Sequence, residues 1–269
     1  MTLNLNGIRS AAAKGFVPWA EAAGADCMGV QEVKAQATDL SAAGLEQLAG
    51  LRGHFHLAQK KGYSGVGLYA RHEPSDVVAG IGDAEFDDEG RWVELRFDSA
   101  TSSRRRPFAR LSVISCYFPS GSSGPQRQAA KFRFLDLVFP HLMRLKAQRE
   151  FILVGDVNIA HKAIDLKNWR SNQGNSGFLP EERAWMDRLL GTGPGEGGLV
   201  DVFRTLNPHP EQYTWWSNRG QAWAKNVGWR LDYHLATPAV AALARQQGIH
   251  LQPRLSDHAP LTIDYAFSL

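Results

Sequence analysis

Short apolar runs recur along the chain and predict buried β-strands. Residues 27–31 and 151–154 are almost continuously apolar, and such runs bounded by polar residues or glycine are typical of buried strands. Further extended segments are expected at 2–5, 229–236 and 261–267. Two pairs of runs are joined by turn residues or a polar loop and predict hairpins, namely 54–59 with 65–70 and 92–97 with 111–118.

Helical periodicity separates these strands. The longest helical pattern covers residues 126–149, where Phe132, Leu135 and Leu142 fall on one apolar stripe and Pro140 should introduce a kink. Shorter helices are expected at 18–23, 39–51, 181–190 and 239–247. Because hairpins are mixed with helical crossovers, the pattern predicts an α/β fold with mixed or largely antiparallel sheets, in one domain over residues 1–269.

Composition and charge narrow the classes of function only a little. A hydrophobic fraction of 43% and a charged fraction of 21% are those of an ordinary globular protein, and a net charge of +3 permits a nucleic-acid partner without requiring one. Cys27 and Cys116 each lie in an apolar run, so we expect reduced core residues of a cytoplasmic protein. No apolar run approaches the roughly 20 residues of a membrane span, so no membrane partner is expected.

Polar side chains that can do chemistry stand at the ends of several predicted strands. Asp156 and Asn158 follow the run 151–154, and residues two apart in an extended segment project to the same side. Asp and Asn are also common in simple turns, so this pair alone leaves a turn as an alternative. The same pattern recurs at other predicted strand ends, at Asn4, Asn6, Glu32, Tyr117, Asp232, Asp257 and His258. Functional sites collect at such ends, which favours a site over a turn.

These side chains indicate the kind of metal and the kind of substrate. Carboxylate and amide oxygens are hard ligands that suit Mg²⁺, or Mn²⁺, better than zinc, and the sequence offers Glu32, Asp156, Asp257, Asn4, Asn6 and Asn158. His258 directly follows Asp257. A histidine beside an oxygen-ligand metal site can bind a phosphoryl oxygen or transfer a proton, although a lone histidine is more often structural.

Taken in order along the chain, these motifs resemble the exonuclease III and class II AP endonuclease family of DNA repair, in its bacterial form. The Gly-Asp-x-Asn and Ser-Asp-His motifs are shared with a wider group of phosphoesterases, whereas segments 172–178 and 226–233 are more specific to the DNA-repair branch. The matching segments are 4–9, 31–34, 117–119, 155–160, 172–178, 226–233 and 256–258.

The resemblance implies a four-layer α/β sandwich, with two packed mixed β-sheets flanked by helices. It implies that Glu32 is the main Mg²⁺ ligand, with Asp257, Asn6 and Asn4 near it. It implies that Asp156 activates the attacking water or protonates the leaving oxygen, while Asn158 and Tyr117 hold the phosphate. His258 would contact a phosphate oxygen, with Asp232 fixing the tautomer of its ring.

The resemblance also implies residues that read the DNA. Trp215, Trp229 and Leu231 would wall a pocket for a base-free sugar that has rotated out of the duplex, although aromatic residues on strands can also be simple core residues. The residues expected to contact DNA phosphates or close the site are Arg9, Lys34, Asn172, Asn175 and Arg230.

The expected function is therefore Mg²⁺-dependent DNA repair by a monomer in the bacterial cytoplasm. The substrate would be double-stranded DNA carrying abasic sites or 3′ blocks, cut 5′ to the abasic site, with 3′→5′ exonuclease or 3′-phosphodiesterase activity as further possibilities. Two alternatives stay open at this point. One is a phosphatase of inositol phosphates or lipids, and the other is a non-catalytic DNA-binding relative, which should have lost Glu32, Asp156 or His258.

Overall fold

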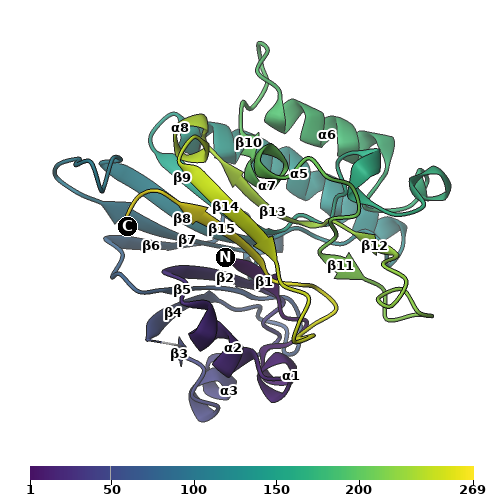
Figure 1. The fold of residues 1–269 in the computed structure, drawn as a ribbon, viewed down its shortest axis with the longest axis horizontal. Coiled ribbons are helices and arrows are strands. Elements are labelled where there is room, and N and C mark those ends of the chain that lie inside the picture. Colours follow the sequence, from purple (N-terminus) through teal and green to yellow (C-terminus); the bar gives the residue numbers. More distant parts are fainter. Residues whose placement is uncertain (49) are drawn as a thin grey trace.

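In the computed structural model, which describes residues 1–48 and 50–269, the chain forms two β-sheets stacked face to face. Helices cover the outer face of each sheet, so four layers lie one on another (Figure 1). Strands that meet across the interface include β2 (Cys27–Gln31) and β5 (Val66–Ala70) of one sheet and β7 (Trp92–Asp98) and β8 (Arg110–Tyr117) of the other. A bond from Gln31 Nε2 to Ser115 Oγ, 2.9 Å long, crosses the interface near the site.

The first sheet has seven strands in the order β14-β15-β1-β2-β5-β4-β3. Its strands β1 and β2 run parallel, and its other pairs run antiparallel. Its outer face is covered by α1 (Ile8–Ala13), α2 (Phe16–Ala23) and α3 (Ala37–Ala42), which bury Ile8, Phe16 and Leu40 against Leu3 and Met28. The remaining strands of this sheet are β1 (Thr2–Asn4), β3 (Gln47–Leu48), β4 (Leu51–His56), β14 (Ala244–Ile249) and β15 (Leu261–Tyr265).

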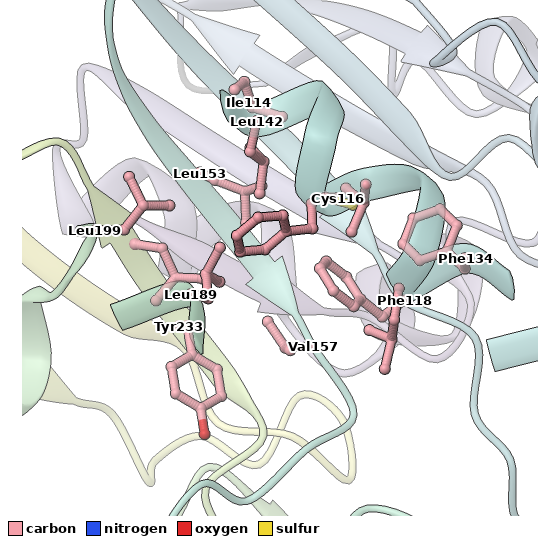
Figure 2. Close-up of a cluster of buried hydrophobic side chains, with 14 of the residues drawn as sticks. Ile114, Cys116, Phe118, Phe134, Leu142, Leu153, Val157, Leu189, Leu199 and Tyr233 are labelled. Atoms are coloured by element: carbon pink, nitrogen blue, oxygen red, sulfur yellow. The ribbon is translucent and has the colours of Figure 1, made fainter. Parts of the chain in front are cut away.

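The second sheet has six strands in the order β10-β13-β9-β8-β7-β6. The helix α5 (Pro125–Lys146) joins β8 to its parallel neighbour β9 (Glu150–Asp156), and α6 (Pro180–Leu190) lies beside it. Phe134 and Leu142 of α5 pack on Leu153 and Tyr233 in the core beneath these helices (Figure 2). The other strands are β6 (Asp76–Ala79), β10 (Val200–Asp201) and β13 (Asp232–Ala236).

Shorter elements complete the connections between the layers. A small hairpin of β11 (Trp215–Trp216) and β12 (Gly228–Trp229) lies at one end of the sandwich (Figure 1). The other elements are α4 (Ala84–Asp87), η1 (Ala163–Asp165), η2 (Trp169–Asn172), α7 (Val202–Leu206) and α8 (Pro238–Ala241). Within residues 1–48 and 50–269, no helix combines the length and the apolar character needed to cross a lipid bilayer.

Most predicted strands are confirmed, and two of the predicted helices are wrong in part. The helix expected at 239–247 ends at Ala241, and residues 244–249 form β14 on the edge of the first sheet. The helix expected at 39–51 ends at Ala42, because Gly44 adopts a left-handed backbone that stops it before β3. In both segments a short run of residues does not distinguish helical from strand periodicity. Pairing with a neighbouring strand in the folded protein decides which one forms. The pattern around Pro140 forms one helix throughout.

Candidate active site

The register of the strands brings the polar residues at their ends together. Asp156 ends β9, where it lies opposite Tyr117 of β8 on one side and Asp232 of β13 on the other. Asn4 ends β1 opposite Gln31, the last residue of β2, so Glu32 follows beside it. Asn4 Nδ2 donates to Asp156 Oδ2 at 2.9 Å and to Glu32 Oε1 at 2.9 Å, which joins the two sheets at this edge.

The backbone at this edge is unusual in four places. Asn6, Glu32, Lys34 and Asn158 all have positive φ, between 45° and 56°. A non-glycine residue rarely adopts this conformation, and such residues cluster at functional sites. Just before Asp156, Gly155 has φ 147°, and a Cβ there would lie 1.9 Å from the carbonyl oxygen of Cys116. Only glycine therefore fits at this position of β9, directly before Asp156.

Asp156, His258 and Asp232 form a buried chain of acid, base and acid. His258 Nδ1 lies 2.8 Å from Asp232 Oδ2, and His258 Nε2 lies 3.7 Å from Asp156 Oδ2. Burial raises the pKa of Asp156 to about 7, an effect that the nearby His258 opposes. Burial alone would lower the pKa of His258, but the Asp232 and Asp156 carboxylates outweigh it and raise that pKa to about 10. The site can thus hold a protonated imidazolium beside a carboxylate that titrates near neutrality.

Oxygen atoms of Glu32 and Asn6 converge on one cationic group. Lys34 Nζ lies 2.6 Å from Glu32 Oε2 and 2.6 Å from Asn6 Oδ1. Asn6 Nδ2 donates to Asp257 Oδ1 at 3.0 Å, so Asp257 borders the same place. Although burial would raise the pKa of Glu32, Lys34 and Asn4 hold it below its ordinary value, so Glu32 is ionised at neutral pH.

This arrangement fits a divalent metal ion, although among the described residues no three His, Cys, Asp or Glu side chains already stand in a metal-binding cluster. Glu32 and Asn6 offer convergent hard oxygens, and Lys34 shows that a positive charge is stabilised between them. Asn4 does not fit the role of ligand that was expected for it. Its side chain is fully buried, its Oδ1 accepts a bond from the Asn6 N–H, and its Nδ2 orients two carboxylates.

Asn158 and Tyr117 both lie next to Asp156. The Asn158 N–H donates to Asp156 Oδ1 at 2.9 Å, and Asn158 Nδ2 donates to Asp156 Oδ2 at 3.2 Å and to the Phe118 carbonyl at 3.0 Å. Burial and the neighbouring carboxylates of Glu32 and Asp156 hold the pKa of Tyr117 well above its ordinary value. The Tyr117 hydroxyl therefore remains a neutral donor.

An apolar wall borders the carboxylate site. Trp215, Trp229 and Leu231 belong to one cluster, and the two indole rings meet edge to face with centroids 6.4 Å apart. Trp215 Nε1 donates to Asp257 Oδ2 at 3.2 Å, so this wall is fixed to the acidic residues. Asp257 also lines a cavity of about 310 Å³, together with Asn6 and Arg254.

The structure separates the residues that were expected to contact DNA. Arg9 is exposed on α1 and pairs with Asp39 at 3.3 Å. Asn175 is exposed, Asn172 is half-buried, and the Asn175 Nδ2 donates to Asn172 Oδ1 at 2.8 Å. These side chains are available to a ligand at the surface, and so is Lys34, which is 30% exposed while it contacts Glu32.

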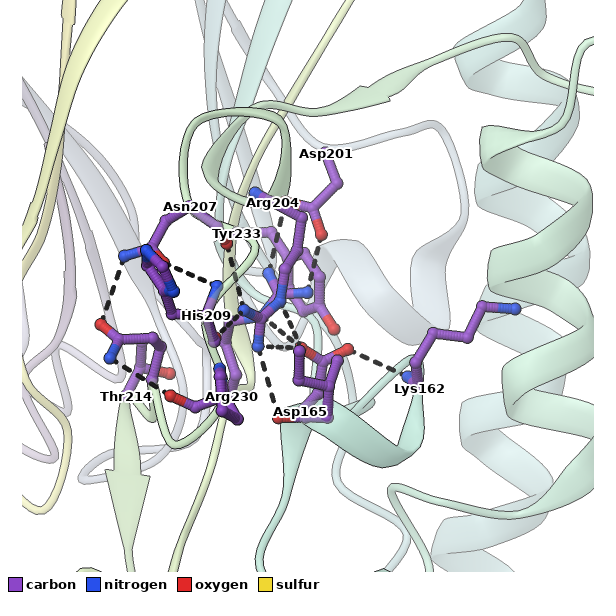
Figure 3. Close-up of polar contacts among 12 residues, drawn as sticks. Lys162, Asp165, Asp201, Arg204, Asn207, His209, Thr214, Arg230 and Tyr233 are labelled. Atoms are coloured by element: carbon purple, nitrogen blue, oxygen red, sulfur yellow. Dashed lines mark hydrogen bonds and ion pairs between the residues drawn. The ribbon is translucent and has the colours of Figure 1, made fainter.

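Arg230 lies inside the protein, which contradicts the expectation that it contacts a DNA phosphate. Its side chain is 0% exposed, and its guanidinium donates to Asp165 at 2.8 Å and to Asp201 at 2.7 Å. Arg204 shares Asp165 with it, at 2.8 Å, in one buried network (Figure 3). Burial would raise the pKa of Asp165, but the two guanidinium groups lower it to about 2. Arg230 thus anchors the segment that carries Trp229 and Leu231.

Sequence reasoning missed a buried ion pair next to Asn158. Lys131 of α5 and Glu182 of α6 are both 0% exposed, with 2.6 Å between Lys131 Nζ and Glu182 Oε1. One signal was available, because Lys131 stands among the apolar positions Ala130, Phe134 and Leu135 of its helix. A lysine at a core position is rarely buried without a partner.

Three kinds of comparison agree on the family. Residues 1–258 match the model of the Endonuclease/Exonuclease/phosphatase family. The chain is 32% identical over 262 residues to an exodeoxyribonuclease of Bacillus subtilis, covering 97% of this chain and 96% of the relative. It is 33% identical over 264 residues to a DNA-(apurinic or apyrimidinic site) endonuclease of Dictyostelium discoideum, covering 97% of this chain and 68% of that protein.

The solved structures give the same result for the fold. An AP endonuclease of Leishmania major superimposes with a TM-score of 0.83 at 26% identity, over 97% of this chain and 85% of that one. The α/β sandwich predicted from the sequence is confirmed by this match and by the two stacked sheets. With its carboxylates, Asn158 and His258 gathered at one edge of those sheets, the chain belongs to the endonuclease/exonuclease/phosphatase family, in the branch of exonuclease III and the AP endonucleases.

Proposed function

We propose that this chain is a metal-dependent DNA repair nuclease that hydrolyses the phosphodiester 5′ to abasic sites in double-stranded DNA. The observation that carries the proposal is the buried row of Asp156, His258 and Asp232 beside the ionised Glu32. The relative from Dictyostelium discoideum is an endonuclease for such sites. The Bacillus subtilis relative is an exodeoxyribonuclease, which supports a second action on 3′ ends, as a 3′→5′ exonuclease or 3′-phosphodiesterase.

In this proposal Glu32, Asn6 and Asp257 hold a divalent cation, with Mg²⁺ the best fit and Mn²⁺ a substitute, because all the donors are hard oxygens. When bound, such an ion neutralises negative charge on the non-bridging phosphate oxygens. Lys34 gives up its contacts with Glu32 and Asn6 and turns to a DNA phosphate instead. Its long side chain is 30% exposed, so it has room to do so.

The remaining roles belong to the row of buried groups. Asp156, ionised near neutral pH, accepts the proton of the attacking water. The imidazolium of His258 donates through Nε2 to a phosphate oxygen, while Asp232 holds Nδ1 and keeps the ring charged and oriented. The hydroxyl of Tyr117 and the amide of Asn158 complete the donors around the phosphate, where charge grows as the bond breaks.

Damage recognition is assigned to the apolar wall. A sugar without a base loses neither stacking nor pairing when it rotates out of the duplex, so its extrusion costs little. Trp215, Trp229 and Leu231 have the rigid bulk to accept that sugar and exclude one that still carries a base. Arg9, Asn172 and Asn175 hold the DNA backbone around it, since Arg9 and Asn175 are exposed and Asn172 is half-buried.

The competing proposal is a phosphatase for inositol phosphates or lipids on the same scaffold. Its substrate would need cationic contacts around a small polar ring, whereas an indole pair and a leucine border this site. The non-catalytic alternative requires loss of Glu32, Asp156 or His258, and all three are present. Asn4 donates to both Glu32 and Asp156, and His258 lies beside Asp156. We further propose that residues 1–269 act as one domain and as a monomer.

The test is a single set of assays on purified protein with Mg²⁺. Substrates are duplexes with an abasic site, a 3′-phosphate or an intact recessed 3′ end, together with an inositol polyphosphate. Incision 5′ to the abasic site is expected, and Glu32→Gln should remove most of it while the thermal unfolding transition persists. Hydrolysis of the inositol phosphate alone, or full turnover of Glu32→Gln at limiting Mg²⁺, would refute the proposal.

A further inference from the structure

The carbonyl group of Asn158 is held by a buried charge that has no role in the chemistry described above. Lys131 Nζ donates to Asn158 O at 2.7 Å, and the same ammonium lies 2.6 Å from Glu182 Oε1. Asn158 has a left-handed backbone, with φ 56°. A non-glycine residue keeps this conformation only when its surroundings impose it. The bond from Lys131 is one such constraint, and it comes from α5, a helix fixed in the core through Phe134 and Leu135.

Glu182 connects the same ammonium to the loop that carries Asn172 and Asn175. Its Oε2 accepts bonds from the backbone N–H groups of Gly177, at 2.7 Å, and Leu179, at 3.0 Å. Gln128 Nε2 donates to Oε1 at 3.1 Å, so both carboxylate oxygens are engaged. A single buried pair thus touches the end of the surface loop and the turn that follows Asp156.

The loop and the turn also touch each other directly. The Ala160 N–H donates to the Gly177 carbonyl at 2.8 Å. A Cβ on Gly177 would lie 3.1 Å from Asn158 O and 3.3 Å from Cζ3 of Trp229, with φ at 92°. A side chain at position 177 would therefore press on the Asn158 carbonyl and on one indole of the apolar wall.

We propose that Lys131, together with Glu182, is a positioning residue for catalysis, which fixes Asn158 against Asp156 and couples that turn to the DNA-contacting loop 172–179. The proposal rests on the proposed function, because it gives Asn158 a part in catalysis. Asn158 donates to both oxygens of Asp156, through its N–H at 2.9 Å and its Nδ2 at 3.2 Å. A displaced Asn158 would therefore also release the base.

A neighbouring ion pair on the same helix has no bond to the catalytic turn. Arg133 lies two residues further along α5 and pairs with Glu85 at 2.6 Å, but both side chains are largely exposed. That pair joins α5 to α4, away from the catalytic turn. It provides a matched control, on the same helix, that lacks any bond to Asn158.

The main test is the variant Lys131→Met/Glu182→Gln, which removes both buried charges and keeps an amide oxygen for the Gly177 and Leu179 N–H groups. We expect a cooperative unfolding transition, a Kd for abasic duplex within about threefold of the parent, and a kcat lower by on the order of 10- to 100-fold. The control Arg133→Met/Glu85→Gln should keep kcat within about twofold. Pair removal that leaves the kcat of the folded protein unchanged would overturn the proposal.

A double-mutant cycle shows whether the effect passes through Asn158. If it does, the pair substitution should cost less in an Asn158→Ala background than in the parent, because only the main-chain N–H of residue 158 is left there to contact Asp156, whereas independent effects would multiply. Multiplied losses would contradict the positioning role. If Asn158→Ala alone has the parent kcat, the assigned part of Asn158 in catalysis is itself refuted, and the inference falls with it. If Asn158→Ala is impaired but the pair variant is fully active, the positioning role of Lys131 is refuted while the proposed function stands.

Gly177→Ala serves if the pair variant does not fold. It disturbs the same carbonyl from the loop side and leaves the ion pair in place. We expect a reduced kcat for the folded variant, again with a smaller loss in the Asn158→Ala background than in the parent. A folded Gly177→Ala protein with unchanged kcat would show that the Asn158 carbonyl need not be held, and would overturn the proposal.

Discussion

Asp156 is the residue on which contacts from both sheets meet. It accepts from Asn4 of the first sheet and from Asn158 of its own turn, and its carboxylate faces His258. Burial makes the ionised form costly, which raises its pKa to about 7. A carboxylate with an ordinary pKa would be a poor proton acceptor at neutral pH, so the enclosure of this group prepares it as a base.

The pH dependence of the rate follows from that shift. Asp156 must be ionised to accept a proton, so kcat/KM should rise with pH through a single ionisation with a midpoint no higher than about 7, because a cation near Glu32 can only lower it. The measurement is kcat/KM from pH 5 to 9 with metal saturating at each pH. A rate that falls through this range would mean that Asp156 donates a proton to the leaving oxygen instead.

His258 should matter more to turnover than to binding. Its charge is kept by Asp232, and its contact with the phosphate strengthens as negative charge develops. His258→Asn should therefore lower kcat by on the order of 100-fold or more, and Asp232→Asn should cause a smaller loss by releasing the ring. Steady-state kinetics on an abasic duplex checks both. Variants that change only KM would make His258 a substrate-binding residue.

At the scale of elements, the strand ends were predictable and the packing between elements was not. Apolar runs and the polar residues that follow them predicted that Glu32, Asp156 and His258 belong to one site, because functional side chains collect at the ends of buried strands. The resemblance gave Arg230 a contact with a DNA phosphate, although its side chain is buried, and the strand pattern missed Lys131 and Glu182. Burial of a charged residue depends on a partner from a distant element, here Asp165 or α6, and no local pattern reveals that partner.

The hairpin of β11 and β12 presents the two indoles of the apolar wall, and its role in recognition can be tested. Trp215→Ala or Trp229→Ala should weaken incision at abasic sites and also narrow the preference for abasic over intact duplex, because shape no longer excludes a base. Incision rates on the two duplexes measure this preference. Trp19→Ala, in α2 outside this wall, is the control. Lower activity with unchanged preference would mean that the indoles only support the fold.

For the whole molecule, the deep acidic site and the exposed rim have different tasks. The buried carboxylates sit where two sheets end, while Arg9, Lys34 and the asparagines of the 172–178 loop come from separate elements around them. The net charge is only +3, so attraction to DNA must come from this local arrangement and not from the protein as a whole.

The affinity for DNA should therefore fall as salt rises, with a slope set by the number of phosphates that the protein contacts. Each phosphate neutralised by Lys or Arg releases condensed counterions, so log K should fall by about 0.9 per contact for each tenfold rise in salt. Arg9→Gln should reduce this slope by about one contact while the kcat of bound substrate changes little.

The measurement is the affinity for an abasic duplex across a salt series, with Arg52→Gln, which removes the exposed pair with Glu73, as the control. A flat response in the unmodified protein would indicate a small-molecule substrate, and an unchanged slope in Arg9→Gln would remove that residue from the DNA contact.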